Sequence, residues 1–419
     1  MNEHIRSFRD LSAESFDTRT LLKNAAAQAI ERRYEDFFIA DVDSHHYETE
    51  AFKEIAEFIE DPVLRAEAKF QGTSRGGISS ETGSYQEISG RITRYPERKN
   101  EKVPPKPHRD ITLMERWMDQ LGVDMAIMFP TPMLNLSNCP RHEVEVGLAR
   151  GYNRWLCDTI LDKEPRIKSM LYLPFHDPEA CYKMVEDFGD RKGVVGFMVT
   201  ATHYTRNYQN PYMKLYAALQ ERGLPLGFHA AFTWADQSLQ LTNRFIAVHG
   251  LGFTWCNMLH MANWLVNGMP ERFPKLKTIW IESGLAWIPF MMQRLDNEFM
   301  MRTSDAPLLK RKPSDYMREM YYTSQPMEMV DNRKALEVTF EMINAPTQLL
   351  YSSDYPHWDM DLPSTIYDLP FLDEAAKRNI LGGNAQTLFK LDPVLSPVKQ
   401  ARLAARQAAA ANAAGVAAE

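Results

Sequence analysis

The sequence predicts an α/β fold, a (β/α)8 or TIM barrel, on three observations. Eight short apolar runs bounded by turn residues lie within residues 37–394, and amphipathic helical segments separate most of them. Strands that alternate with helices form a parallel sheet, because parallel strands need crossover connections. No glycine-rich phosphate-binding motif follows the first run, so an open, doubly wound sheet is less well supported than the closed barrel.

The eight predicted strands share a high content of β-branched, aromatic and other apolar residues. Helices are predicted between them where apolar residues recur at three- and four-residue spacing, as in 142–161, 178–189 and 211–222. The predicted strands are FFIAD (37–41), DMAIMF (124–129), IKSMLYL (167–173), GVVGFMVT (193–200), LPLGFHA (224–230), LKTIWIE (276–282), EMYYTS (319–324) and TQLLYSS (347–353).

Three segments do not fit the regular strand and helix units. Residues 1–36 are rich in helix formers and are predicted to be an N-terminal helical extension. Residues 71–110 form a long insertion after the first strand, rich in Gly, Ser, Pro and charge, which suits a lid over the barrel mouth or a partner-binding excursion. Residues 395–419 are an Ala-rich, low-complexity tail that can form a helix but can bury little surface.

The composition of the 419-residue chain is that of an ordinary globular protein acting on small molecules. Hydrophobic residues make up 44%, and 48 Lys and Arg residues against 55 Asp and Glu residues give a net charge of −7. Without a Lys/Arg stripe, a nucleic-acid partner is not expected. No stretch is apolar enough for a membrane helix and no secretory signal is seen, so we expect a cytoplasmic protein that does not bind membranes.

The four cysteines are widely spaced, and none belongs to a CxxC pair. Such a pattern is typical of buried or incidental thiols and not of a disulfide frame or a thiolate zinc site. Any metal must therefore be held by histidine and carboxylate side chains. The cysteines are Cys139, Cys157, Cys181 and Cys256.

Potential metal ligands stand at the ends of four predicted strands, and strand ends at one mouth of a barrel form the active site. Asp43 and His45 follow the first run and share one face, because side chains alternate along a strand. Each of these residues alone has an ordinary structural explanation, as a hydrogen-bonded histidine, a turn residue or a helix cap. Burying all of them together would cost several kcal/mol of folding free energy for each unpaired group, and a bound cation removes that cost. The candidates at the strand ends are Asp43, His45 and Glu48, then His229, Glu282 and Asp354.

The remaining histidines are weaker candidates. His357, three residues after Asp354, is well placed to orient a metal ligand or the substrate. His46 suits either a partner of a ligand or a strand-face position, and His260 lies in a helical stretch where a core role competes with metal binding.

Five segments in the expected order resemble the amidohydrolase-related branch of the amidohydrolase superfamily. They are DVDSHHYE (41–48), FHAAF (228–232), MPERFPKLKTIWIESGLAWIPF (269–290), SSDYPH (352–357) and GGNAQTLFKL (382–391). The resemblance implies a metal-dependent barrel whose ion is held by Asp43, His45, His229 and Asp354. Family decarboxylases and hydratases typically carry a catalytic histidine where this chain has Glu282. With a glutamate at this position, the chain is similar to a subgroup of the family that includes dinuclear non-haem iron hydroxylases.

Three functional hypotheses follow. In the first, one Zn or Mn ion activates water or polarises the carboxylate of a small organic acid, giving hydrolysis of a C–N or C–C bond or decarboxylation. Glu282 or Asp354 would then accept the proton, with His357 beside Asp354.

In the second hypothesis, two ions, an Fe or Mn/Fe pair, activate O2 for hydroxylation, with electrons from separate redox partners. In the third, the chain is a non-catalytic paralogue that keeps a structural metal and pairs with an active subunit through 71–110 and the tail. A homo-oligomer or a hetero-oligomer with a paralogue is expected. The dinuclear site would use Asp43, His45, Glu48, His229, His260, Glu282 and Asp354.

Overall fold

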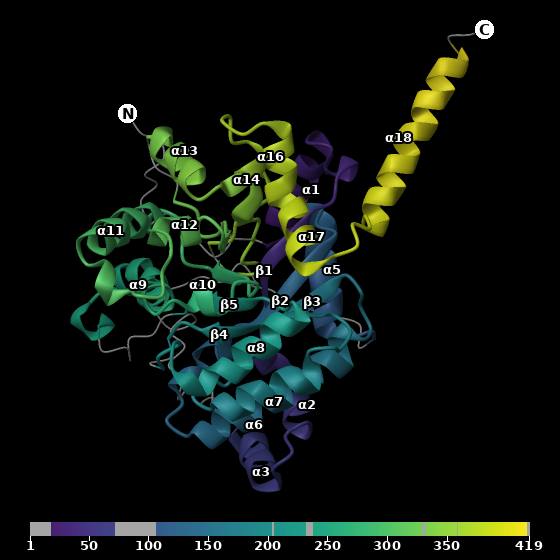
Figure 1. The fold of residues 1–419 in the computed structure, drawn as a ribbon. Coiled ribbons are helices and arrows are strands. Elements are labelled where there is room, and N and C mark those ends of the chain that lie inside the picture. The colour runs from purple at the N-terminus through teal and green to yellow at the C-terminus, as the bar shows by residue number, and fades with distance from the viewer. Residues whose placement is uncertain are drawn as a thin grey trace.

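Eight parallel strands in sequential order form the centre of the molecule, as the computed structural model shows (Figure 1). The structure describes residues 18–71, 106–202, 205–231, 238–328, 332–357 and 359–416. The last strand returns to the first, since the Val42 amide donates to the Tyr351 carbonyl at 2.9 Å and the Asp354 amide donates to the Asp43 carbonyl at 2.8 Å. The predicted (β/α)8 barrel is confirmed.

All eight predicted strands are present, and almost every residue in them is buried. The largest difference is in the first strand, which was predicted to end at Asp41 and in fact continues through His46. Polar residues usually end a strand, but those of β1 are buried because they face a site inside the barrel. The strands are β1 (Ala40–His46), β2 (Met125–Pro130), β3 (Ile167–Tyr172), β4 (Val194–Thr200), β5 (Leu226–His229), β6 (Thr278–Ile281), β7 (Tyr321–Thr323) and β8 (Leu349–Leu350).

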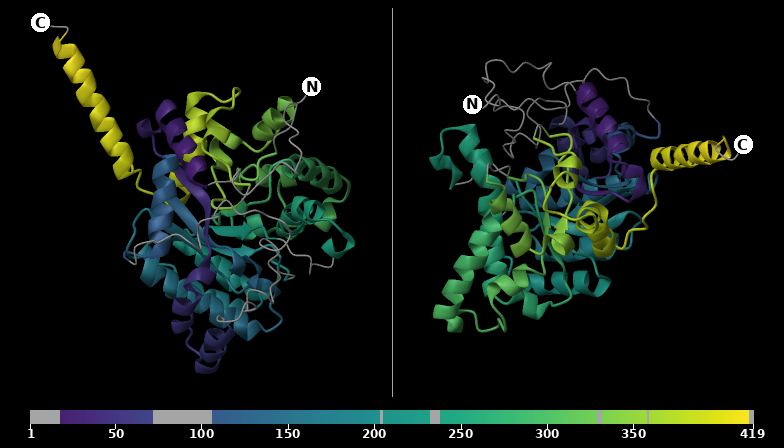
Figure 2. Two further views of the ribbon diagram at one scale, coloured as in Figure 1. Left: turned by 180° about the vertical axis from the view of Figure 1, so that it is seen from behind. Right: turned by 90° about the horizontal axis from the view of Figure 1, so that it is seen from above.

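Helices surround the barrel, as Figure 2 shows from two further directions. The described α-helices are α1 (Thr18–Glu31), α2 (Phe52–Glu57), α3 (Pro62–Gln71), α5 (Arg109–Leu121), α6 (His142–Leu156), α7 (Pro178–Phe188), α8 (Met213–Arg222), α9 (Phe245–Val266), α10 (Met269–Arg272), α11 (Trp287–Met301), α12 (Pro313–Met317), α13 (Arg333–Met342), α14 (Ala345–Gln348), α15 (Ser364–Tyr367), α16 (Glu374–Arg378), α17 (Asn384–Phe389) and α18 (Pro397–Val416). Shorter 3₁₀ and π turns include η3 (Tyr34–Asp36), η5 (Pro132–Asn138) and the π-helix η6 (Cys157–Leu161). None of the described helices has both the length and the apolar composition needed to cross a bilayer.

The three predicted helices are present with local reasons for their ends. The helix predicted over 142–161 is α6 continued by the π turn η6. Helix α7 begins where the Asp177 carboxylate accepts the Ala180 amide at 2.9 Å, and Pro178 occupies the first helical position, where it is best tolerated. Helix α8 ends at Gly223, whose φ of 65° suits glycine.

The C-terminal tail forms α18. A buried contact of Lys399, which we call the α18 clamp, holds the start of this helix to the barrel, and the far end of the helix is exposed. The Lys399 ammonium, almost fully buried, donates to the Phe37 carbonyl at 2.7 Å and pairs with Asp124 at 2.5 Å. Arg406 forms ion pairs with Glu35 and Asp36. Beyond them, residues 407–412 are exposed and the helix extends away from the barrel (Figures 1 and 2).

The two other segments outside the barrel units are described in part. Within 1–36, the structure describes α1 and η3, and residues 1–17 lie outside the described part of the chain. Within 71–110, residue 71 belongs to α3 and α5 begins at Arg109, while 72–105 lie outside the described residues. The lid and partner-binding hypotheses for this insertion therefore stay predictions.

Candidate metal centre

Four strand ends bring five potential ligands together at one mouth of the barrel. Asp43 and His45 lie on β1 and share a face, as the alternation of side chains predicts. His229 is the last residue of β5, Glu282 directly follows β6, and Asp354 lies beyond the end of β8. This placement agrees with the prediction from the strand ends.

The ligand atoms lie close enough to share an ion. His45 Nε2 is 3.1 Å from Asp43 Oδ1 and 3.3 Å from Asp354 Oδ1. His229 Nε2 is 3.3 Å from the same Asp43 oxygen. One ligand atom from each of Asp43, His45, His229 and Glu282 lies within 4.8 Å of the others. The structure therefore gathers all four side chains around one small volume.

Burial makes this cluster costly without a cation. Asp43, His229 and Asp354 are fully buried, and His45 and Glu282 are 2% exposed. Both oxygens of Asp43 and the Nε2 atoms of His45 and His229 make no hydrogen bond to any described residue. An unpaired buried polar group costs several kcal/mol, and a divalent ion would satisfy all four atoms at once. The residues present thus fit a divalent metal.

Hydrogen bonds at the far side of each imidazole orient the ring. His45 Nδ1 lies 2.9 Å from the Pro130 carbonyl, and His229 Nδ1 lies 2.7 Å from the Ala230 carbonyl. A carbonyl oxygen only accepts, so each Nδ1 carries the proton and each Nε2 presents its lone pair to the centre of the cluster. This is the tautomer that binds a metal.

The charge states are those that favour metal binding. Burial, with His357 close by, lowers the pKa of His45, which keeps its imidazole neutral. Burial alone would raise the pKa of Asp43, but His229 and His45 outweigh it and hold that pKa below the ordinary value. A neutral His45 imidazole and an ionised Asp43 carboxylate are ready to coordinate a cation.

Two of the carboxylates come from residues with unusual backbone conformations. Glu282 has a φ of 55° and Asp354 a φ of 59°, in the left-handed region that non-glycine residues seldom adopt. The Glu282 amide donates to Thr323 Oγ1 at 2.9 Å, which helps to fix the turn after β6. Such conformations cost about 1–3 kcal/mol each and cluster at functional sites.

His357 and Gln325 contact Asp354 from two sides. His357 Nδ1 lies 2.6 Å from Asp354 Oδ1, and Gln325 Nε2 donates to Asp354 Oδ2 at 3.2 Å. The other ring nitrogen of His357 is 3.3 Å from Thr131 Oγ1. His357 therefore lies where the sequence placed it, beside a ligand. Gln325 and Thr131 were not predicted, because nothing in their local sequence distinguishes them from ordinary loop residues.

Asp41 is a further residue that the sequence analysis left out. Its buried carboxylate accepts the amides of Ser353 at 2.9 Å and Asp43 at 3.1 Å, and also the Ser353 hydroxyl. The register of β1 against β2 shifts between Asp41 and Ser44, so the alternation that pairs Asp43 with His45 does not extend to Asp41.

Two of the seven predicted ligands lie elsewhere. In place of a metal contact, the Glu48 oxygens accept the backbone amides of Thr131 at 2.9 Å and Met133 at 2.6 Å. His260, on α9, places Nε2 2.9 Å from the Ala201 carbonyl. Of the seven predicted ligands, the structure brings together Asp43, His45, His229, Glu282 and Asp354, whereas Glu48 and His260 contact backbone groups of neighbouring loops.

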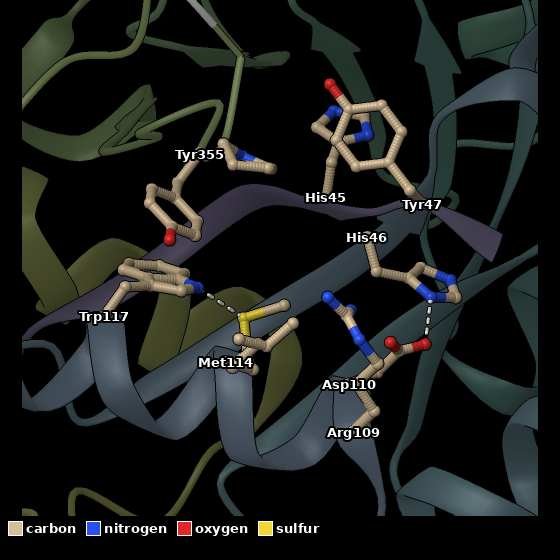
Figure 3. A pocket seen from close by; sticks show the side chains of 10 residues that line it. His45, His46, Tyr47, Arg109, Asp110, Met114, Trp117 and Tyr355 are labelled. Carbon is tan, nitrogen blue, oxygen red and sulfur yellow. Dashed lines mark hydrogen bonds and ion pairs between the residues drawn. The ribbon is translucent and has the colours of Figure 1, made fainter. Parts of the chain in front are cut away.

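His46 points away from the cluster, into a small pocket between β1 and α5 (Figure 3). Its Nδ1 lies 2.9 Å from Asp110 Oδ2, and its Nε2 lies 2.8 Å from the Tyr152 hydroxyl. Trp117 and Tyr355 form the apolar end of the same pocket. Since successive residues face opposite sides of a strand, His45 serves the cluster and His46 secures α5 and α6 to β1.

A parallel barrel with carboxylates and imidazoles at four of its strand ends defines a class of metal-dependent barrel enzymes. The amidohydrolase family model matches residues 104–391, more than half of the chain, and the chain belongs to this family. The predicted family is confirmed. The match begins after β1, so the assignment of Asp43 and His45 depends on the geometry described above.

The relatives with known activity are decarboxylases. The chain is 25% identical over 293 residues to gamma-resorcylate decarboxylase of a Polaromonas species, covering 66% of this chain and 86% of that protein. It is 23% identical over 291 residues to the Rhizobium enzyme of the same name, covering 66% and 85%. The chain is therefore an enzyme of the amidohydrolase family.

Solved structures share the fold. The 5-carboxyvanillate decarboxylase of Sphingomonas paucimobilis aligns with a TM-score of 0.60 at 21% identity, covering 85% of this chain and all of that one. The corresponding enzyme of Novosphingobium aromaticivorans, complexed with manganese and a nitrobenzoic acid, aligns with a TM-score of 0.62 at 18% identity, covering 85% and 97%. The buried cluster agrees with the predicted divalent metal cofactor.

Proposed function

We propose that this enzyme is a divalent-metal-dependent decarboxylase of small hydroxylated aromatic carboxylic acids. The observation that carries the proposal is the buried cluster of Asp43, His45, His229, Glu282 and Asp354 at the barrel mouth. The gamma-resorcylate and 5-carboxyvanillate decarboxylases among the relatives favour decarboxylation over hydrolysis.

Asp43, His45, His229 and Asp354 are the residues that would hold the ion, with Glu282 next to it. A bound divalent ion polarises the substrate oxygen atoms that it contacts and stabilises the charge that develops on them. The donor set has three carboxylates, two imidazoles and no thiolate, which suits Mn at least as well as Zn.

Decarboxylation breaks a C–C bond, leaves the electron pair on the ring carbon and requires a proton there. His357 and Asp354 share a short hydrogen bond of 2.6 Å and can hold a proton between Nδ1 and Oδ1. Glu282 is a further carboxylate at the mouth, and its Oε2 lies 3.6 Å from His229 Nδ1. We assign Glu282 and the Asp354–His357 pair to proton handling.

The relatives give no support to the dinuclear oxygenase or to the redox partners that it would need. The non-catalytic paralogue and the homo- or hetero-oligomer stay predictions. Metal content separates these alternatives. About one Mn or Zn per chain fits the decarboxylase, about two metals including Fe fit the oxygenase, and no tightly held metal fits the non-catalytic subunit.

A direct assay tests the proposal. The chain, stripped with a chelator and reloaded with Mn2+ or Zn2+, is incubated with 2,6-dihydroxybenzoate, 5-carboxyvanillate and unsubstituted benzoate, and CO2 release is measured. We expect metal-dependent CO2 release from a hydroxybenzoate and none from benzoate or from the His229→Ala variant. Metal-loaded protein that releases no CO2 from any hydroxybenzoate would refute the proposed activity.

A further inference from the structure

Helix α9 is apolar both on the side that packs against the barrel and on the side that faces solvent. Met261, Trp264 and Leu265 on its inner side belong to the hydrophobic core. Residues 245–266 contain no Asp, Glu, Lys or Arg. A helix that is hydrophobic all round is normally buried, so the apolar outer side indicates a surface that a partner covers. The large exposed side chains of α9 include Leu251 (58% exposed), Trp255 (43%), Leu259 (47%) and Val266 (36%).

Six apolar side chains form one stripe along the outer side of this helix, which we call the α9 stripe. Its members are Leu251, Trp255, Met258, Leu259, Ala262 and Val266. Four of them are exposed, and Met258 and Ala262 are half-buried. At 3.6 residues per turn, all six lie within about 100° of the helix circumference. Steps of three and four residues are also the spacing of the seam along which two helices pack.

The α9 stripe has the same spacing in both directions along the chain. From Leu251 to Val266 its members are separated by 4, 3, 1, 3 and 4 residues. An antiparallel helix of identical sequence therefore brings each member opposite another member of the stripe. The pairs are Leu251 with Val266, Trp255 with Ala262, and Met258 with Leu259.

This pairing is complementary in size as well as in position. The largest side chain of the stripe, Trp255, lies opposite the smallest, Ala262, and large side chains facing small ones allow two helices to interdigitate. In a two-fold interface, residue i of one copy contacts residue j of the other and residue j contacts residue i. The stripe meets that condition with itself, so a second copy of the chain is the partner that it fits.

Helix α11 lies beside α9 on one side of the barrel and extends the apolar surface (Figure 1). Its Phe290, Met300 and Met301 side chains are exposed. With a rise of about 1.5 Å per residue and a width of about 10 Å, the 22 residues of α9 and the 15 of α11 offer about 550 Å2 per copy. Two copies would bury about 1,100 Å2 in total, which is enough for a specific interface.

A membrane surface fits the α9 stripe less well than a second copy does. Helices that lie in a bilayer surface usually carry Lys or Arg on their polar side, and α9 has neither. The described part of the chain also contains no helix that could cross a bilayer.

We propose that the α9 stripe is the contact between two copies of this chain, with the two α9 helices antiparallel across a two-fold axis. Met258 and Leu259 lie next to the axis, and Leu251 and Val266 lie at the two ends of the contact. This gives the predicted homo-oligomer a defined surface. The contact does not depend on the proposed decarboxylation, and its test needs no substrate.

Sedimentation velocity of the purified full chain, over a range of protein concentrations, tests the contact. We expect the wild-type protein to have at least twice the mass of one chain. Leu259→Glu buries an unpaired carboxylate beside the axis, so it should at least halve that mass or raise the dissociation constant about 100-fold. Val63→Glu is the matched control, because Val63 on α3 is apolar, exposed and outside the stripe. A monomeric wild-type protein, or a Leu259→Glu variant that assembles like the control, would overturn the proposal.

Oxidative cross-linking tests the antiparallel register. In Leu251→Cys/Val266→Cys, the two cysteines of one copy are about 22 Å apart along the helix, too far for a disulfide within the chain. The proposed register brings each of them opposite its counterpart in the other copy, so we expect cross-linked dimers. Ile246→Cys/Val266→Cys is the control, because Ile246 is exposed on another side of α9. Equal cross-linking in the two variants would overturn the register. Circular dichroism confirms that the variants are folded.

Discussion

The carboxylate of Asp41 accepts hydrogen bonds from both the backbone amide and the hydroxyl of Ser353, which lies 312 residues later in the chain. The Ser353 hydroxyl in turn accepts the Tyr355 amide at 3.0 Å, and Asp41 also accepts the Asp43 amide. One buried side chain therefore fastens the segment after β8 to β1. Asp43 lies two residues after Asp41, and Asp354 directly follows Ser353. His45 contacts the carboxylates of both.

Replacing Asp41 with Asn should weaken metal binding without removing any ligand. The amide side chain keeps one acceptor oxygen where the carboxylate has two, so either the Ser353 amide or its hydroxyl loses its partner. Loss of a group that orients ligands typically lowers metal affinity by about 10–100-fold. Titration calorimetry with Mn2+ measures this, with the surface substitution Asp187→Asn as control. An unchanged Kd in Asp41→Asn would show that the β1–β8 contact does not position the ligands.

Removing a ligand should abolish metal retention. We expect Asp43→Ala, His229→Ala and Asp354→Ala each to lose the ion after dialysis, whereas the exposed-site control Glu298→Ala keeps it. A ligand at 100 times its Kd stabilises the fold by about 2.7 kcal/mol, so Mn2+ should raise the Tm of the control and not that of the variants. Elemental analysis and thermal unfolding check both points. Full occupancy in all three variants would exclude this cluster as the metal site.

Glu48→Gln should separate a loop-anchoring role from a metal-binding role. The Glu48 oxygens accept the Thr131 and Met133 amides, and glutamine offers only one oxygen to these two donors. We expect a loss of about 1–3 kcal/mol in the free energy of unfolding, because one buried amide loses its partner. Metal content should stay the same. Loss of the metal with unchanged stability would return Glu48 to the set of ligands.

Lys399→Met should destabilise the protein through the start of α18. The substitution removes a buried ammonium and leaves the fully buried Asp124 carboxylate with the amides of Ile39 and Ser396 as its partners among the described residues. Breaking a buried ion pair from one side typically costs about 3–5 kcal/mol. Gln407→Met, on the exposed part of the same helix, is the control. Equal unfolding midpoints in denaturant for the two variants would show that the α18 clamp contributes little.

Glu115 should make the stability of the fold depend on pH between about 4.5 and 7. Burial first, and then the hydrogen bond and charge of Glu164, raise the pKa of Glu115 to about 7 from its ordinary value of 4.5. The folded state thus binds a proton more tightly than the unfolded state, so this contribution is present in full below pH 4.5 and is lost as the pH rises through about 7.

Thermal unfolding from pH 4.5 to 8 measures the contribution of Glu115. Because the neutral amide cannot ionise, Glu115→Gln should flatten the dependence of Tm on pH in this window, whereas the exposed-site control Glu337→Gln should not. The same slope in both variants would assign the dependence to other groups.

The sequence by itself determined the barrel and the strand ends that carry the candidate metal ligands. Periodic apolar runs indicate which residues are buried, so all eight strands were predicted. The candidate ligands could be predicted because parallel strands bring their ends to one mouth, and a residue's place at a strand end is a local property. The same local logic failed for β1, whose polar residues were taken to follow the strand although they belong to it.

Only the tertiary structure decided which polar residues meet. Glu48 and His260 have the same ligand chemistry as Asp43 and His229, yet they hold backbone groups of loops, a difference that depends on chain segments far apart in sequence. The contact between Asp41 and Ser353 joins segments brought together by barrel closure. Hydrogen bonds form over about 3 Å, and a one-dimensional pattern does not encode distances on that scale.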